Sequence, residues 1–452
     1  MKRRLAAGIA VAMSAALALS ACSATSEDGA EPKTIKVAYQ TTATFNQMQI
    51  LMAAAKSQYE EANPGVTIEL VPIQGESADY YTKLALMNQS PATAPDVQYE
   101  DTFKIQSDAA AGYLLPLDDR LADWADYSQF ADGAKSAGLG ADGKTYGVSL
   151  GTDTRALWYN KDLFTQAGIA VPWEPKTWAD VLEAASTIKA KLPDVIPFNV
   201  YSGKAAGEAA SMQGFQMLLY GTKDTLYDTS TKKWITGSDG FADSLQFVED
   251  VYQGDLGPTP QQALDPNIFT NVTAEWLPKG QLAIALDGSW QSAAWIPSGT
   301  NPWPEWSNVL SQAPMPTQKG DAPGLNSMSG GWTLAVGAKT KAPDLAFDFL
   351  TTALNQENSK AYDIGNSQIA VRDDVAADPE YTAANPSFAF FSSLVADTHF
   401  RAATEDYAQI SNAITVAMES VMTGQQSVDD AAAAYDEALV GIVGQDGTQS
   451  AD

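Results

Sequence analysis

Residues 34–70, TIKVAYQTTATFNQMQILMAAAKSQYEEANPGVTIEL, decide the fold class. Ile35, Val37 and Tyr39 alternate with polar or small residues, which predicts a short strand, and a similar alternation returns at residues 66–70. Between them, residues 45–62 predict a helix that ends at the Asn-Pro-Gly turn of residues 63–65. A strand, a helix and a second strand in this order predict a βαβ unit, and therefore a largely parallel sheet.

Strands and helices continue to alternate along the rest of the chain. One helix is well marked, because Thr177 with Asp180 three residues later predicts a capping box before an apolar face. Near the C-terminus, Gly424 predicts the end of a long helix, and Ser427 with Asp430 predicts the start of a last one. This pattern predicts an α/β fold with two lobes. Further strands are predicted at residues 96–99, 146–150, 155–159, 282–286 and 333–336, and further helices at residues 80–89, at residues 103–111 and from residue 343 onward.

Residues 1–21 have the order of a secretory signal, with basic residues at positions 2–4 before an apolar stretch over residues 5–19. A retained transmembrane helix is the alternative, but the apolar segment is rich in alanine and short for a bilayer core of about 30 Å. The segment ends Leu-Ser-Ala-Cys, which resembles a bacterial lipobox, so we expect a lipoprotein signal peptide over residues 1–21 and a lipid on Cys22. Residues 22–33 are small, polar and acidic, which predicts a flexible leash.

The charge and the scarcity of two residue types exclude several classes of function. The net charge is −28, and it becomes −31 once residues 1–21 with their three basic groups are removed. Nucleic acids and anionic membrane surfaces need a positive field, so we expect neither as a partner. The chain holds one histidine and one cysteine, which makes His/Cys metal sites and Cys-His or Ser-His catalysis improbable. We therefore expect no metal and no cofactor.

Short patches spread over the chain carry a resemblance to a known family. Each patch is weak alone, but their order and spacing are specific. They are Pro95-Asp96-Val97, Gly112, Leu115-Pro116-Leu117, Tyr146-Gly147-Val148, Tyr159 to Phe164 (YNKDLF), Lys279-Gly280, Asp287-Gly288-Ser289-Trp290, Gly330-Gly331-Trp332, and Thr423 to Ala431 (TGQQSVDDA). In these patches the sequence resembles the extracellular solute-binding proteins of sugar ABC importers, the group that includes the bacterial maltose-binding protein.

The resemblance implies two α/β lobes joined by hinge segments, with the ligand held in a cleft between them. Each lobe would be discontinuous, with the chain crossing near Gly151, Leu286 and Leu354. The implied N-terminal lobe comprises residues 34–150 and 287–353. The implied C-terminal lobe comprises residues 151–286 and 354–447.

A neutral sugar presents C–H groups on its faces, which pack on aromatic rings, and hydroxyls on its edge, which need hydrogen-bond partners. Its site should therefore combine Trp or Tyr with polar side chains. The resemblance places Trp290 and Trp332 at the cleft, and the glycines at 330–331 would let the backbone before Trp332 approach a ligand or bend sharply. Trp158 and Trp178 lie at strand and helix positions that fit the core instead.

Four polar side chains are the other candidate ligand contacts. Glu100 follows a predicted strand, and ligands bind outside the carboxyl ends of parallel strands. Asp153 matches a family position whose carboxylate accepts sugar hydroxyls. Asn46 lies in the first βα loop region, and Asp406 begins a helix whose family counterpart lines the cleft. The plain alternatives are a solvated acidic loop for Glu100 and an ordinary N-terminal helix charge for Asp406.

Two features stay open at the level of sequence. Arg372 and Arg401 could also reach the cleft, and nothing in the sequence decides between them. The Trp/Pro-rich residues 295–306 (WIPSGTNPWPEW) could close one end of the cleft or pack on the surface of a lobe.

These observations predict a substrate-binding lipoprotein at the extracytoplasmic face of a bacterial cell membrane. It would be a monomer that captures an oligosaccharide between its lobes and delivers it to the membrane permease subunits of an ABC importer, and it would not be an enzyme. Two alternatives remain at this stage. One is an exported glycoside hydrolase, since paired carboxylates would suffice for it. The other is a receptor of the same fold for a cationic ligand such as a polyamine or a peptide.

Overall fold

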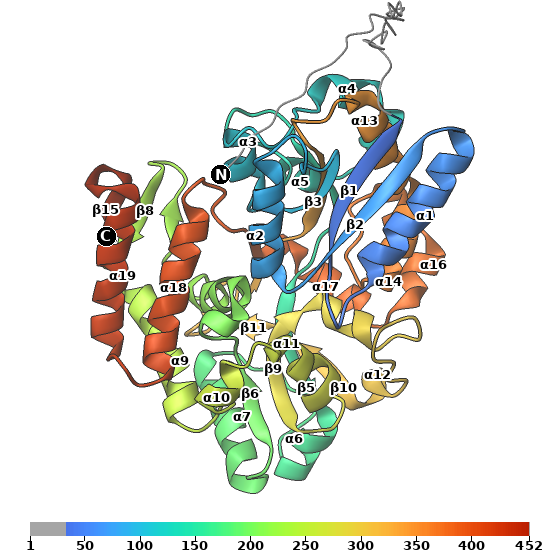
Figure 1. The fold of residues 1–452 in the computed structure, drawn as a ribbon. Helices are drawn as coiled ribbons and strands as arrows, with labels where there is room; N and C mark the ends of the chain where they lie inside the picture. The colour runs from blue at the N-terminus through green and yellow to red at the C-terminus, as the bar shows by residue number, and fades with distance from the viewer. Residues whose placement is uncertain (1–32, 452) are drawn as a thin grey trace, which may run out of the picture.

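The structure is a computed structural model, and it describes residues 33–451. The predicted signal peptide and Cys22 lie outside the described residues, as does nearly all of the predicted leash. Two mixed sheets form the centres of two lobes, with the five-stranded sheet in the upper part of Figure 1 and the four-stranded sheet in the lower part. The fold is therefore the predicted two-lobed α/β fold.

The sheet of the first lobe has the strand order β2-β1-β3-β13-β4. These strands are β1 (Thr34–Thr41), β2 (Thr67–Gln74), β3 (Val97–Asp101), β13 (Trp332–Val336) and β4 (Gly147–Gly151). The predicted βαβ unit is present, because β1 runs parallel to both β2 and β3. The sheet is less parallel than predicted, since β13 is antiparallel to β3 and β4. This strand arrives from the other lobe, so no helical crossover fixes its direction.

The sheet of the second lobe has the strand order β10-β5-β9-β6. Its strands are β10 (Leu310–Ala313), β5 (Arg155–Asn160), β9 (Leu282–Gly288) and β6 (Ile196–Asn199). Strand β5 is antiparallel to both of its neighbours, and β6 is parallel to β9. Strands β5 and β9 are buried along their whole length, as expected for strands covered on both faces.

Helices cover both sheets and bury two separate apolar cores. On the first lobe, α1 (Gln47–Ala62) packs against α13 (Pro343–Ala353) and α14 (Gln356–Gly365). On the second lobe, α18 (Tyr407–Met422) packs against α19 (Val428–Val443) and α9 (Asp239–Gln253), with α18 and α19 in red at the left of Figure 1. Over residues 33–451, no helix is both long enough and apolar enough to cross a membrane.

The remaining elements are shorter or lie at the edges of the lobes. The helices are α2 (Ser77–Asn88), α3 (Ile105–Ala110), α4 (Asp118–Asp123), α5 (Asp132–Ser136), α6 (Lys161–Ala167), α7 (Trp178–Lys191), α8 (Met217–Leu219), α10 (Pro260–Ala263), α11 (Ile268–Thr270), α12 (Trp306–Val309), α15 (Asp373–Ala376), α16 (Pro379–Ala384) and α17 (Phe388–Ser393). The strands are β7 (Tyr227–Asp228), β8 (Lys233–Thr236), β11 (Met315–Pro316), β12 (Leu325–Met328), β14 (Thr398–His399) and β15 (Thr448–Ser450). Two π-helical segments, Ala210–Gln216 and Asn271–Trp276, belong to the second lobe.

Both predicted helix caps are confirmed. The Thr177 hydroxyl accepts a hydrogen bond from the Asp180 backbone N–H at 3.3 Å, and the Asp180 carboxylate accepts one from the Thr177 N–H at 2.9 Å. At the start of α19, the Ser427 hydroxyl accepts from the Asp430 N–H at 3.2 Å. Each cap satisfies backbone donors that the first helical turn leaves free.

The tryptophans assigned to the core lie there, and the open question about residues 295–306 is answered by packing. Trp158 is fully buried, and Trp178 is 5% exposed. Trp295 and Trp306 pack edge-on against Trp158, with ring centroids 5.6 and 6.0 Å away. The loop is thus anchored in the core of the second lobe. One of its residues, Thr300, donates a hydrogen bond to the Thr44 carbonyl of the first lobe at 2.5 Å.

The chain passes between the lobes at crossing segments. Residues 152–154 join β4 to β5, and residues 329–331 join β12 to β13. Thr152 and Ile369 exchange backbone hydrogen bonds of 2.9 and 2.8 Å, so a third segment lies beside the first.

We keep the crossing near Gly151 as a proposal, and strand and helix packing favours later positions for the other two. Strand β10 pairs with β5 in the second lobe although it falls in residues 287–353. Helix α14 packs against α1 in the first lobe although it falls in residues 354–447. We therefore propose crossings near residues 330 and 370 in place of Leu286 and Leu354.

Candidate ligand-binding cleft

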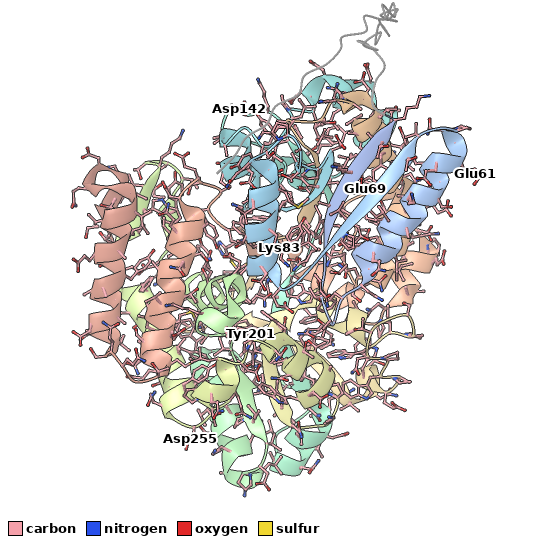
Figure 2. All side chains as sticks on the ribbon, in the orientation of Figure 1. Glu61, Glu69, Lys83, Asp142, Tyr201 and Asp255 are labelled. Atoms are coloured by element: carbon pink, nitrogen blue, oxygen red, sulfur yellow. The ribbon has the colours of Figure 1, made fainter. Side chains whose placement is uncertain are left out.

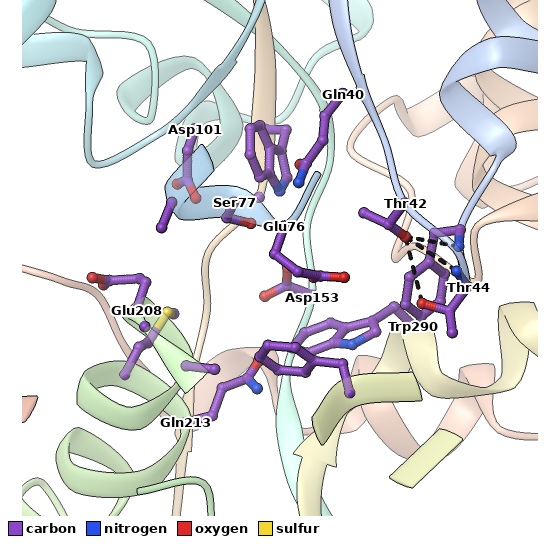
Figure 3. A pocket seen from close by; sticks show the side chains of 18 of the residues that line it. Gln40, Thr42, Thr44, Glu76, Ser77, Asp101, Asp153, Glu208, Gln213 and Trp290 are labelled. Atoms are coloured by element: carbon purple, nitrogen blue, oxygen red, sulfur yellow. Dashed lines mark hydrogen bonds between the residues drawn. The ribbon is translucent and has the colours of Figure 1, made fainter. Parts of the chain in front are cut away.

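A cavity of about 260 Å³ lies between the two lobes, near the lower end of the size range of small-molecule sites. The first lobe lines it with residues at or just after the carboxyl ends of the parallel strands β1, β2 and β3. The second lobe lines it mainly with residues 204–213 and with Phe269, Trp290 and Arg401. Figure 3 shows side chains of both lobes pointing into this space.

Trp332 is the main aromatic group on the wall of the first lobe. Its indole stacks on Tyr99, with centroids 4.2 Å apart and an angle of 6° between the planes. Tyr81 lies 5.9 Å away at 26°, and Tyr80 meets the indole edge-on at 6.0 Å. Tyr99 therefore covers one face of Trp332, and the side chain is only half-buried and lines the cavity.

The glycines before Trp332 lie where two chain segments pass each other beside the cavity. Gly331 has φ of +132°, and a Cβ there would lie 2.6 Å from the Gly151 carbonyl oxygen. A side chain at this position would therefore clash with the first crossing segment. The glycine is required mainly for two chain segments to pass each other, although Gly331 also borders the cavity.

Trp290 lies on the opposite wall and folds back over its own turn. A Cβ on Gly288 would lie 2.0 Å from the indole, so only glycine leaves room for this conformation. The Arg155 guanidinium lies 4.6 Å from the centroid of the Trp290 ring. One face of Trp290 thus meets a cation, while the side chain stays half-buried and lines the cavity.

Asp153 lies on the first crossing segment and is almost fully buried. Its carboxylate forms an ion pair with Arg155 and accepts a hydrogen bond from the Gly330 N–H at 2.9 Å. Arg155 also donates to the Met328 carbonyl at 3.1 Å. Burial lowers the pKa of Arg155, and Asp153 acts in the opposite direction. This carboxylate therefore joins two crossing segments in addition to lining the cavity.

A second buried ion-pair network spans the two lobes. Arg401, from the second lobe, lies 2.6 Å from Asp101 at the end of β3 and 3.4 Å from Glu208. Asp101 also accepts a hydrogen bond from the Tyr81 hydroxyl at 2.8 Å, and Glu208 accepts one from the Tyr407 hydroxyl at 2.7 Å. Burial raises the pKa of Glu208 even though Arg401 lowers it. Burial lowers the pKa of Arg401, but Asp101 and Glu208 outweigh it, and the net pKa is raised.

Several polar groups of the cavity remain available to a ligand. The Gln40 amide donates to the Gly75 carbonyl at 2.9 Å, which fixes its orientation at the rim. Gln213 lies within the π-helical segment Ala210–Gln216, and Figure 3 shows its side chain beside the pocket. Glu76 is half-buried at the start of α2 and reaches into the same space. Among residues 33–451, no group of His, Cys, Asp and Glu side chains is arranged to hold a metal ion.

Three of the six predicted ligand contacts lie on the cavity wall and three do not. Asp153, Trp290 and Trp332 line it. Asn46 precedes α1 and is half-buried, but the cavity is lined by its neighbours Phe45 and Gln47. Asp406 precedes α18 and lies outside the lining as well.

Glu100 is also outside the cavity, because β3 is longer than predicted. Strand β3 runs through Asp101, and successive side chains of a strand point to opposite faces. Asp101 therefore reaches the cavity, while Glu100 is buried on the other face and accepts a hydrogen bond from Gln98 at 2.8 Å. Burial and the nearby Asp108 raise the pKa of Glu100.

The two undecided arginines have different locations. Arg401 lines the cavity, whereas Arg372 is held by Asp126, by Asp374 and by the Leu354 carbonyl away from it. The sequence did not point to Glu208 at all. This residue lies between two short helical segments in an Ala/Gly-rich stretch, where no periodicity reports which way a side chain points.

Comparison with known sequences gives matches over most of the chain. The profile of the family described as bacterial extracellular solute-binding protein matches residues 42–360. A putative binding protein of Brucella abortus is 33% identical over 137 residues, which are 30% of this chain and 31% of that protein. The aligned part therefore spans about a third of that relative's length. The maltodextrin-binding protein MdxE of Bacillus subtilis is 25% identical over 362 residues, which are 77% of this chain and 76% of that protein.

Solved structures with the same fold cover almost the whole chain. The GacH receptor of Streptomyces glaucescens, described unliganded and in complex with acarbose, superposes with a TM-score of 0.77 at 23% identity. The match covers 91% of this chain and 98% of that receptor. An ABC transporter solute-binding protein of Thermotoga lettingae, bound with α-D-tagatose, gives a TM-score of 0.78 at 21% identity, over 91% of this chain and 100% of that one. Both establish the two-lobed fold.

Proposed function

The chain belongs to the bacterial extracellular solute-binding proteins, and from this membership we propose that it captures an oligosaccharide between its lobes for an ABC importer. The family is extracellular, so the chain works outside the cytoplasm. Its relatives with long alignments include proteins named for maltodextrin and for maltooligosaccharide.

One observation carries the proposal: aromatic surfaces from both lobes face one cavity that also offers polar side chains. Trp332 and Tyr81 lie on the wall of the first lobe, and Trp290 and Phe269 lie on the wall of the second. Sugar faces pack on such rings, and the hydroxyls at the sugar edge need partners such as Gln40 and Gln213. Platforms on two separate walls suit a ligand of two or more rings.

Capture proceeds by closure of the lobes over the ligand. A sugar bound to one wall gains the second set of contacts only when the lobes approach, so it favours the closed arrangement through its differential affinity. Residues 152–154 and 329–331 then act as hinges, since they carry the chain between the two sheets. The closed form is the one that the permease would recognise.

We propose binding without hydrolysis. A glycosidase needs one carboxyl group to donate a proton and a second carboxylate free to act as nucleophile or base. Asp153 and Asp101, at the centre of the cleft, are each engaged by a buried arginine. Arg401 engages Glu208 as well, so within residues 33–451 only Glu76 of the cleft carboxylates lacks an arginine, and a single free carboxylate does not supply the pair that a glycosidase needs.

We also propose that the mature protein is a monomer held to the membrane by a lipid on Cys22. The Leu-Ser-Ala-Cys sequence supports this, as does the name of a Streptococcus pneumoniae relative, a maltooligosaccharide ABC transporter solute-binding lipoprotein. Two or more acyl chains on one residue would hold the protein stably, whereas one chain would not. Mass spectrometry of residue 22 from membrane-extracted protein tests the anchor, and an unmodified thiol there would contradict it.

A thermal-shift screen against a panel of glycans tests the function. A ligand at about 100 times its Kd adds roughly 2.7 kcal/mol to the free energy of unfolding, which raises the melting temperature measurably. The sugar recovered after incubation should be intact. A panel that shifts nothing, or that returns cleaved products, would contradict the proposal.

A further inference from the structure

The charges that line the cleft are unequal in number. Seven charged side chains face the cavity, of which four are carboxylates and three are cations. The carboxylates are Glu76, Asp101, Asp153 and Glu208, and the cations are Arg155, Lys204 and Arg401. The charge that a ligand meets in the cleft depends on which of these carboxylates the cations already neutralise.

Both arginines are committed to carboxylates of the cleft. Arg155 pairs with Asp153, and Arg401 pairs with both Asp101 and Glu208. These ion pairs are buried, with side chains between 4 and 16% exposed, so water screens them little. Lys204 is exposed, and none of the ion pairs within residues 33–451 includes it. The arginines therefore leave one carboxylate, that of Glu76, without a partner.

Glu76 is placed to meet a bound ligand. It immediately precedes α2, is half-buried, and points into the pocket in Figure 3. Within residues 33–451 its carboxylate takes part in no ion pair and no side-chain hydrogen bond. The pKa of Tyr201 is raised mainly by burial and by Asp287, and more weakly by the negative charge of Glu76. Since Tyr201 belongs to the second lobe, the carboxylate of Glu76 reaches toward the opposite wall.

If the lobes closed over a neutral sugar ring, the negative charge of Glu76 would have no positive partner. Burial and the adjacent Asp79 already raise the pKa of Glu76, which means that its charged form is disfavoured where it stands. Excluding more water would raise that cost, because a buried charge needs a partner of opposite sign. A ligand that brings a cation would remove the penalty and form a charge-assisted hydrogen bond. The aromatic rings of Tyr81 and Phe269 around the cavity would also accept a cation over their faces.

We propose that the ligand is an oligosaccharide with a basic nitrogen, such as an amino sugar with a free ammonium group, and that Glu76 is the residue that selects it. This inference rests on the proposed function and narrows it to a class of glycan. The rest of the ligand is an ordinary polyhydroxyl chain that stacks on the aromatic walls, and Glu76 recognises only the ammonium substituent.

The test compares matched pairs of oligosaccharides by titration calorimetry. In each pair the linkage and the number of rings are the same, and one hydroxyl of the neutral partner is an amine in the other. The proteins are the wild type, Glu76→Gln and, as a control, Glu61→Gln. Glu61 is an exposed carboxylate near the end of α1, at the outer edge of the first lobe in Figure 2.

We expect the aminated partner to bind the wild type at least tenfold more tightly than the neutral one, equivalent to about 1.4 kcal/mol. Glu76→Gln should weaken binding of the aminated partner more than that of the neutral one and so abolish this preference, while Glu61→Gln should preserve it. Lowering the pH through the raised pKa of Glu76 should weaken binding of the aminated partner as the carboxylate gains its proton, and Glu76→Gln should lose that dependence. Tyr201, Lys204, Asp79, Asp153 and Arg155 lie around the site and are the same in both proteins, so their contributions cancel in the comparison.

The outcomes separate the inference from the function on which it rests. The inference alone would be overturned if the wild type bound both partners with equal affinity, or if Glu76→Gln lost the same affinity for both. Either result would show that Glu76 binds hydroxyls and does not select a cation. If neither partner of any pair binds, the proposed function falls together with the inference.

Discussion

Replacing Trp332 with alanine should damage both folding and binding, and a second tryptophan of the same lobe provides the control. Trp332 contacts three tyrosines, at centroid distances of 4.2, 5.9 and 6.0 Å. Each such pair contributes about 0.5–1.5 kcal/mol beyond the area it buries, and full truncation of a core Trp costs about 3–5 kcal/mol. Because Trp332 is half-buried, we expect Trp332→Ala to lower the free energy of unfolding by about 3 kcal/mol.

The control is Trp124→Ala. Trp124 is also half-buried in the first lobe and contacts three aromatic rings, at 6.1, 5.4 and 6.3 Å, but it does not line the cavity. Both variants should lose a similar amount of stability in urea denaturation. Only Trp332→Ala should also lose about 2 kcal/mol of sugar binding, roughly thirtyfold in Kd, in calorimetry well below its melting temperature. If the two variants bind the sugar equally well, Trp332 is a structural residue and does not stack on the ligand.

Three further changes test the cleft and its supports. Asp101→Asn should lower the free energy of unfolding by about 2 kcal/mol, because it removes a charged partner from buried Arg401. The control is Asp344→Asn, which should cost little in the same denaturation assay because the pair of Asp344 with Arg120 has the same 2.6 Å distance but is exposed. An equal loss of stability in both variants would contradict the role of burial. Gly331→Ala should lose about 2–3 kcal/mol, since its backbone φ of +132° and the Gly151 carbonyl both exclude a side chain, and an unchanged melting temperature would refute that account. Burial raises the pKa of Asp287 from 3.8 to about 6, so the stabilising effect of its protonated form is complete below pH 4 and is lost as the pH rises through 6. Over this range the free energy of unfolding should fall by about 2–3 kcal/mol because of this group. Asp287→Asn should flatten the pH profile of stability, and an unaltered profile would exclude Asp287 as the titrating group.

The sequence predicts most elements of the fold because local signals determine them. The alternation around Ile35 and the cap formed by Thr177 and Asp180 each report a local backbone conformation, and the structure contains both. The direction of β13 and the location of the crossings depend instead on which distant strands pair. Strand pairing leaves no periodic signal in a single sequence, so β10 falls in the lobe opposite to the one expected.

The cleft was predictable only in part, and the errors have a common cause. Trp290 and Trp332 stand beside glycines that mark sharp turns, and both line the cavity. Glu100 lies outside the cavity lining because β3 continues two residues beyond its predicted end at residue 99, and successive side chains of a strand point to opposite faces. Glu208 and Arg401 meet Asp101 from segments roughly 100 and 300 residues away in the chain, and only the folded arrangement of the two lobes brings these charges together.

Calorimetric titration of the mature protein with an oligosaccharide series and with the component monosaccharide tests the central claim most directly. If the cavity holds two or more rings between aromatic walls of both lobes, one oligosaccharide should bind per protein chain, at least tenfold more tightly than the monosaccharide, and should be recovered uncleaved. Equal affinity for the monosaccharide and the oligosaccharides would contradict an oligosaccharide site, and absence of binding across the whole series would contradict a sugar receptor.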